Sequence, residues 1–134
     1  MALFVCDRDW TRSEQVLRHA LDMSPEDPIA HSWLAEVLIH SQRFPEALAE
    51  AQRAYELDPL STDTNRKVAT CEFCLREYEN CIRTCRRILD LDGQYILGHW
   101  LLGLAQLHAG KGDEALKTFR SACESLSYDP VLLK

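Results

Sequence analysis

Four cysteines lie close together near the middle of the sequence, at Cys71, Cys74, Cys81 and Cys85. Cysteines at such short spacings can hold a zinc ion or form a redox-active dithiol, because a thiolate is both a metal ligand and a nucleophile. This grouping raises the hypothesis of a cysteine-based metal or redox sensor. The remaining two cysteines lie near the two ends of the chain and have no neighbouring thiol in the sequence.

Histidines also recur at matched positions. The step along the chain from His31 to His99 equals the step from His40 to His108. If the members of each set sit two helix pairs apart, they are separated by roughly 20 Å, since packed helices lie about 8–10 Å apart. No single metal ion could bridge that distance. The stretch Gly110-Lys111-Gly112 lacks the rest of a phosphate-binding loop. No nucleophile or pair of acidic residues stands out elsewhere in the sequence. We therefore predict no catalytic residue, no metal site and no cofactor.

The elements that must position these side chains repeat with a period of about 34 residues, a length typical of helical repeat arrays. The pairs Asp27-Pro28 and Asp129-Pro130 are separated by three such periods. Three further series share the period: Ala47, Cys81 and Ala115; Leu34, Val68 and Leu102; and Ala35, Ala69 and Gly103. A repeat array of this kind presents a surface and does not enclose a catalytic pocket.

Each unit reads as two helices. In residues 28–61, Asp27 is a suitable N-cap and Pro28 fits the first helical position, where no N–H is needed. Pro45 opens the second helix and Pro59 ends it. The register predicts helix pairs that start near residues 28, 62 and 96, preceded by a lone helix near residues 9–23. The predicted division of the single array, residues 1–134, is a partial repeat (1–27), three repeats (28–61, 62–95 and 96–129) and the start of a truncated one (130–134).

This pattern resembles the tetratricopeptide repeat family, whose signature is W-x2-L-G-x2-Y, then A-x3-F, then P. Residues 96–129 contain His99-x2-Leu102-Gly103 and then Ala115-x3-Phe119. The resemblance covers nearly the whole chain. It implies an all-α fold, a right-handed α-solenoid of antiparallel helix pairs, and a non-enzymatic protein–protein interaction scaffold. The strings DRDW and ELDPLS are also similar to such arrays in bacterial winged-helix and cyclase-like signalling regulators, although residues 1–134 contain neither of those segments.

The repeat register also favours a packing role for the cysteines. Cys81 and Cys85 fall at the phases that Ala47 and Ala51 occupy one repeat earlier. A buried cysteine behaves as a small apolar side chain. Cys71 lies on the adjoining inner face of its helix, and Cys74 falls at the phase of exposed positions.

In the family that this chain resembles, the first helix of each unit lines a concave groove that binds a peptide or a helix. The residues at the corresponding phases are Trp33, Glu36, His40, Arg66, Lys67, Phe73, Trp100, Leu104 and His108. Apolar side chains beside a few charges suit an extended peptide or an amphipathic helix. The carboxylate clamp of the chaperone-binding arrays is not expected. The residues at the positions of that clamp are Ser32, Glu36, Lys67, Leu97 and Leu101. Of these, Lys67 alone could bind a carboxylate.

The C-terminal edge suggests an alternative function. Leu116, Phe119, Leu132 and Leu133 are apolar and come at the end of the array, where we expect them to lack a full cover. Large exposed apolar patches usually mark interfaces. The chain could therefore be the self-association module of a larger signalling protein and form a homodimer.

Charge and hydropathy exclude several partners. The chain has 15 Lys and Arg against 21 Asp and Glu, a net charge of −6, whereas non-specific nucleic-acid binding needs clustered positive charge. No secretory signal is evident. The longest apolar stretch, residues 95–105, is too short to span a bilayer. We expect a protein or peptide partner, no nucleic acid, no membrane association and a cytoplasmic location.

Overall fold

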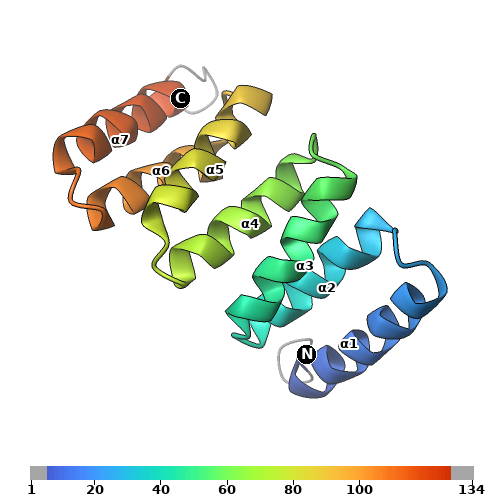
Figure 1. The fold of residues 1–134 in the computed structure, drawn as a ribbon. Coiled ribbons are helices and arrows are strands. Elements are labelled where there is room, and N and C mark those ends of the chain that lie inside the picture. Colours follow the sequence, from blue (N-terminus) through green and yellow to red (C-terminus); the bar gives the residue numbers. More distant parts are fainter. Residues whose placement is uncertain (1–5, 128–134) are drawn as a thin grey trace.

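The protein is an all-α molecule built from consecutive antiparallel helices (Figure 1). The computed structural model describes the backbone of residues 6–127 and the side chains of residues 10–124. That part of the chain has seven helices and no β-strand: α1 (Cys6–Met23), α2 (Pro28–His40), α3 (Phe44–Leu57), α4 (Thr62–Cys74), α5 (Tyr78–Leu91), α6 (Ile96–His108) and α7 (Gly112–Ser127). Among these helices, none is long and apolar enough to cross a membrane.

The expected fold class, an α-solenoid of helix pairs, is confirmed. The first helices of the three pairs begin at Pro28, Thr62 and Ile96, as the register predicted. The lone leading helix is α1, which begins at Cys6 and ends at Met23. The division of residues 1–134 into one partial, three complete and one truncated repeat stays a prediction, and its last segment, 130–134, lies outside the described residues.

Capping residues set the starts of two first helices. The carboxylate of Asp27 accepts a hydrogen bond from the N–H of Ile29 at 3.0 Å, and Pro28 occupies the first turn of α2. The hydroxyl of Ser61 accepts one from the N–H of Thr64 at 3.2 Å at the start of α4. Because a side-chain cap is worth about 1 kcal/mol, these residues fix both helix starts at the same phase of the repeat.

The turn inside each helix pair has one residue in the left-handed region. These residues are Gln42 (φ 61°), Arg76 (φ 64°) and Gly110 (φ 82°), and each stands one repeat after the one before it. Glycine adopts this conformation without a steric penalty, whereas glutamine and arginine do not. All three pairs therefore close with the same backbone turn, although glycine occupies the position in one of them.

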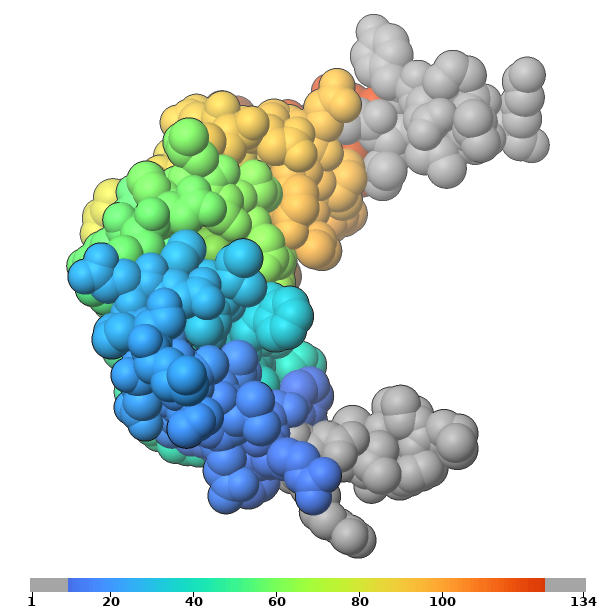
Figure 2. Space-filling view, turned by 90° about the vertical axis from the view of Figure 1, so that its right-hand side faces the viewer, coloured from blue at the N-terminus to red at the C-terminus, as the bar shows by residue number. Residues whose placement is uncertain are grey.

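The helices form a curved array. Each described helix packs on the next, and in addition α2 contacts α4 and α4 contacts α6, whereas the second helices α3, α5 and α7 make no corresponding contacts with one another. The first helices are therefore closer together than the second helices, and the array bends toward them. Figure 2 shows the resulting arc, hollowed along the side where the cyan, green and orange segments of α2, α4 and α6 lie.

The core lies between the two layers of helices and uses small side chains where they cross. Ala35 packs with Ala51, and Ala69 packs with Cys85. At the same phase in the last pair, Gly103 faces the ring of Phe119, so closely that an added Cβ would lie 2.4 Å from a ring carbon. The smallest first-helix residue thus stands opposite the largest second-helix residue.

One buried and one partly buried polar pair also link the helices within a pair. The Thr84 hydroxyl donates to the carboxylate of Glu72 at 2.6 Å, and the Thr118 hydroxyl donates to the side-chain oxygen of Gln106 at 2.6 Å. Both members of the second pair stand one repeat after those of the first. Burial raises the pKa of Glu72, and the hydrogen bond from Thr84 and the charge of Arg87 only partly offset that effect.

The first prediction concerns the close contact at Gly103. Replacing Gly103 with alanine should lower the free energy of unfolding by about 1–2 kcal/mol, because overpacking against Phe119 outweighs the gain in helix propensity. Urea denaturation followed by circular dichroism measures the change. Gly112→Ala is the matched control, since an added Cβ there meets no atom within 4 Å. Equal stability of the two variants would contradict the proposed contact.

The second prediction concerns the buried carboxyl of Glu72. Because its pKa is raised above the ordinary 4.5, ionisation opposes folding: the free energy of unfolding falls as pH rises from about 4.5 through the raised value. Glu72→Gln keeps an acceptor for Thr84 and removes the charge, so it should be more stable than the parent by about 1 kcal/mol at pH 7, with a smaller difference at pH 4.5. Urea titrations at both pH values measure this.

Gln106→Glu is the reciprocal control. It places a carboxyl at the equivalent buried position and should destabilise the protein increasingly as the pH rises. A Glu72→Gln variant that is less stable than the parent at pH 7 would indicate that the ionised carboxylate stabilises the fold through its neighbouring arginines.

Candidate functional site

The candidate site is the inner face of the arc. The nine predicted groove residues come from three helices: Trp33, Glu36 and His40 from α2, Arg66, Lys67 and Phe73 from α4, and Trp100, Leu104 and His108 from α6. These are the helices that contact one another on the hollowed side (Figure 2). The structure brings the nine residues together in two groups, one where α1, α2 and α4 meet and one on α6 and the adjoining end of α4.

The first group surrounds a pocket of about 280 Å³, which we call the aromatic pocket. Its lining comprises Trp10, Ser13, Leu17, Trp33, Glu36, Val37 and Lys67. Trp33 is 62% exposed although it is a large aromatic residue. Two tryptophans and two aliphatic side chains around such a space are typical of a pocket that takes an apolar group.

The charged groups beside this pocket pair among themselves. Arg66 donates to Glu36 at 3.1 Å and to Asp63 at 3.2 Å. Lys67 is 3% exposed, and its ammonium lies 2.9 Å from Asp63 and donates to the hydroxyl of Ser32 at 2.8 Å. The two predicted groove cations are therefore held by side chains of the protein. Lys67 lines the pocket but is not free to hold the carboxylate of a partner.

These ion pairs also fix the charge state of Asp63. Partial burial works to raise the pKa of Asp63, but the hydrogen bond and charge of Lys67 and the charge of Arg66 outweigh it, and the net pKa lies below the ordinary value. Asp63 is therefore ionised at neutral pH. The carboxylate of Glu36 further accepts a hydrogen bond from the Nε2 atom of His40 at 2.8 Å.

Both groove histidines stack on an aromatic ring. The ring of His40 lies 4.7 Å from that of Trp10 with the planes 4° apart, and the ring of His108 lies 5.2 Å from that of Tyr78 at 20°. Phe73 meets His108 edge-on at 5.3 Å. The two stacked pairs are equivalent, since each partner in the second stands two repeats after its counterpart in the first. The arrangement holds each imidazole ring in place at the end of a first helix.

The second helices also contribute side chains to this site, which the predicted groove residues did not include. Trp10, Ser13 and Leu17 come from α1, and Tyr78 from α5. A signal was present, because Trp10, Phe44 and Tyr78 are aromatic residues that follow one another at intervals of one repeat. This series places an aromatic ring near the start of successive second helices, and the rings of Trp10 and Tyr78 reach the end of the next first helix.

The second group is an apolar stripe along α6. Four large side chains lie on its exposed side at spacings of three and four residues: Leu97, Trp100, Leu104 and Leu107. No Asp, Glu, Lys or Arg occurs in α6. The indole of Trp100 also packs on the ring of Phe119 at 5.1 Å between centroids. Trp100 and Leu104 are therefore partly exposed groove residues, and Trp100 also covers the α6–α7 contact.

Of the four residues predicted for self-association, the structure describes Leu116 and Phe119, which both lie on α7. Leu116 is 50% exposed on α7. Phe119 is only partly exposed, because its ring packs inward against Gly103 and Trp100. The other two residues, Leu132 and Leu133, lie outside the described residues. Leu116 is thus the described member of this set that a second chain could contact directly.

Three of the four clustered cysteines are fully buried and belong to two separate parts of the core. Cys71 packs with Leu34 and Leu38, whereas Cys81 and Cys85 lie in the neighbouring core cluster, with their sulfur atoms 4.0 Å apart. The Cys81 thiol donates to the carbonyl of Ala69 at 3.3 Å. Cys74 is exposed. The predicted burial of Cys71, Cys81 and Cys85 is confirmed.

The environment of these thiols disfavours the thiolate form. Burial raises the pKa of Cys71 to about 12. The contact with Cys85, together with burial, raises the pKa of Cys81 further above the ordinary value. Since metal binding and nucleophilic attack both need the thiolate, protonated core thiols are poorly suited to either. Among the described residues, no group of three or more His, Cys, Asp or Glu is arranged to hold a metal ion.

Two histidines outside the groove have structural contacts. His31 lies 2.7 Å from a carboxylate oxygen of Glu50 and 2.7 Å from the carbonyl of Pro25. His99, at the same phase, lies 2.8 Å from the carbonyl of Gly93. Both rings tie the start of a first helix to the segment before it.

Comparison with known sequences gives one family match. The family model described as tetratricopeptide repeat matches residues 6–62 and 86–130. Among curated proteins, Hsp70-Hsp90 organizing protein 2 of Arabidopsis thaliana is 30% identical over 73 residues, which are 54% of this chain and 13% of that protein. The chain therefore spans a small part of that relative's length.

Solved structures with the same architecture include two of MamA. The structure of MamA from residue 41 to its end, from Desulfovibrio magneticus RS-1, has a TM-score of 0.88 at 18% identity, covering 97% of this chain and 74% of that one. A crystal structure of MamA protein has a TM-score of 0.84 at 20% identity, covering 90% and 68%. At these identities the likeness establishes the shared fold.

The third prediction separates a packing role from a sensing role for the buried cysteines. Cys85→Ser should lower the free energy of unfolding by about 1–3 kcal/mol, because it places a hydroxyl in an apolar cluster. Cys74→Ser, at an exposed position, is the control and should change it little. A chelator should leave the melting curve of the parent protein unchanged. Stoichiometric zinc or iron in the purified protein, or chelator-induced unfolding, would support the sensor alternative.

Proposed function

The chain belongs to the tetratricopeptide repeat family, and on that premise we propose that it is a non-enzymatic protein-interaction scaffold that binds a peptide or a helix in its concave groove. The observation that carries this proposal is the aromatic pocket. It lies where three helices meet, and one of its walls is a tryptophan that is 62% exposed. Partly exposed aromatic residues beside a pocket are typical anchors of protein interfaces.

The apolar stripe on α6 supports the same proposal. It extends the apolar surface of the groove beyond the self-paired charges of α4, and it contains Trp100 and Leu104. A ligand that follows the groove can therefore use apolar contacts at both ends. Lys67 and Arg66 are occupied by Asp63 and Glu36, which disfavours recognition of a terminal carboxylate at the centre.

Self-association is the alternative that involves the other surface. Leu116 offers one exposed apolar side chain on α7, whereas Phe119 packs inward. The described part of that edge is thus a smaller apolar surface than the groove. For this reason we favour a partner in the groove as the primary function and retain homodimerisation as the alternative.

The fourth prediction tests groove binding with defined peptides. Peptides that bind the parent chain, selected from a random 12-residue phage library and then synthesised with a fluorophore, should lose at least tenfold in affinity for Trp33→Ala, since truncation of an aromatic anchor costs about 2 kcal/mol or more. Fluorescence anisotropy measures the affinity, and circular dichroism checks that the variant folds.

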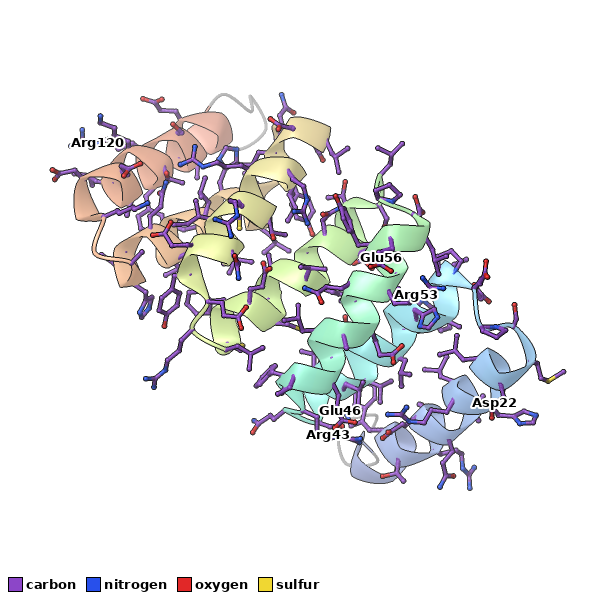
Figure 3. The ribbon with its side chains drawn as sticks, viewed as in Figure 1. Asp22, Arg43, Glu46, Arg53, Glu56 and Arg120 are labelled. Carbon is purple, nitrogen blue, oxygen red and sulfur yellow. The ribbon has the colours of Figure 1, made fainter. Side chains whose placement is uncertain are left out.

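Arg53→Ala is the matched control on the opposite face. Figure 3 shows Arg53 and Glu56 on α3, one of the second helices, which lie on the outer side of the arc. Their exposed ion pair is 3.2 Å long, and such pairs contribute little to stability. The control should bind within twofold of the parent. Selected peptides that bind the parent and the folded Trp33→Ala variant equally would contradict groove binding at this site.

A further inference from the structure

A second pocket adjoins the aromatic pocket on the other side of Trp33. Its volume is about 140 Å³, and we call it the acidic pocket. Its lining comprises Pro28, Ile29, Ser32, Trp33, Asp58, Ser61, Asp63 and Thr64. Trp33 therefore forms a common wall between the two spaces, and a ligand that covers its exposed side chain can reach into both.

The two pockets differ in charge. The aromatic pocket is lined by one carboxylate and one ammonium, those of Glu36 and Lys67, whereas the acidic pocket is lined by Asp58 and Asp63 and by no cationic side chain. The carboxylate of Asp63 forms ion pairs with Lys67 and Arg66. Asp58 forms no ion pair with any described residue and is exposed. The chain as a whole has a net charge of −6, which adds to the attraction for a cation.

The helix starts that border the acidic pocket do not reverse this preference. The N-termini of α2 and α4 carry partial positive charge, and free N–H groups there would suit an anion. Three of these N–H groups are already bonded by side chains: those of Ile29 and Ala30 by Asp27, and that of Thr64 by Ser61. Because Asp63 is paired with Lys67 and Arg66, the preference of this pocket for a cation rests on the unpaired carboxylate of Asp58.

We propose that the groove selects a peptide segment in which a large apolar side chain is followed or preceded, two residues away, by a lysine or an arginine. This specificity rests on the proposed function of peptide binding in the groove. In an extended peptide, side chains two residues apart point to the same side and are separated by roughly 6.6 Å. That spacing places one side chain on either side of the Trp33 indole.

The chemistry of each pocket fits its proposed occupant. The apolar side chain enters between Trp10, Leu17 and Trp33 and removes their exposed surface from water. The aliphatic stem of the lysine or arginine lies along Ile29 and Trp33, and its head group reaches Asp58. A cation close to the indole face of Trp33 gains a further attraction.

The test reads the sequences of peptides selected from a random 12-residue phage library by three proteins: the parent chain, Asp58→Lys and Trp33→Ala. Asp58 is chosen because its charge is not part of the ion pairs that hold α2 against α4. The parent should enrich peptides with a large apolar residue and a Lys or Arg at a distance of two. Asp58→Lys should keep the apolar residue and lose the basic one. Trp33→Ala should enrich neither.

Affinities of synthetic peptides complete the test. A selected peptide should bind the parent about tenfold more tightly than its variant with Glu in place of the basic residue, and Asp58→Lys should abolish or reverse that ratio. If the peptides selected by the parent contain the apolar residue but no basic residue, and this selection is lost in Trp33→Ala, the proposed specificity is wrong and the proposed function still holds. Enrichment that is unchanged by Trp33→Ala would overturn both.

Discussion

The close crossing of the two helices within each pair is the constraint on which the rest of this structure depends. The crossing residues are Ala35 with Ala51, Ala69 with Cys85, and Gly103 with Phe119. As the second-helix residue grows from alanine to phenylalanine, the first-helix residue shrinks to glycine. Since protein cores are packed at high density, this exchange lets helix pairs with different crossing residues stack in one array.

The contacts between successive first helices produce the groove. Successive first helices contact one another, while the described second helices do not, so the first helices lie on the inner side of the arc. Side chains on their exposed faces converge there. The second helices contribute through their starts, where Trp10 and Tyr78 stack on His40 and His108. The groove is thus a consequence of repeat packing, and its chemistry depends on which residues occupy the exposed phases.

The residues at these exposed positions give the groove a charged centre and apolar surface on either side. On α4, Arg66 and Lys67 form ion pairs with Asp63, and Arg66 also pairs with Glu36. The charges at the centre therefore stabilise the array as well as shaping its surface. On either side, Trp33 and the stripe of α6 leave large apolar surface exposed. Apart from the contact of Trp100 with Phe119, this exposed surface is available to a partner.

The sequence by itself determined the fold class, the starts of the first helices in the three pairs and the burial of three cysteines. These features follow from a constant repeat period, from capping residues such as Asp27 and Ser61, and from the phase of each side chain, all of which are local properties of the chain. The same phase identified the helices of the groove. It could not separate a residue that faces the groove from one that completes the core, because both lie on adjoining faces of one helix.

Only the tertiary structure decided how the groove residues are used. The phase of Lys67 suggested a groove cation, yet the approach of α2 and α4 buries it against Ser32 and Asp63. The phase of Phe119 suggested an uncovered edge, yet the space left by Gly103 admits its ring. The pockets beside Trp33 likewise exist because α1, α2, α4 and the α3–α4 loop converge there. Pairing and pocket shape depend on distances between helices that are far apart in the chain, and a periodic pattern does not contain those distances.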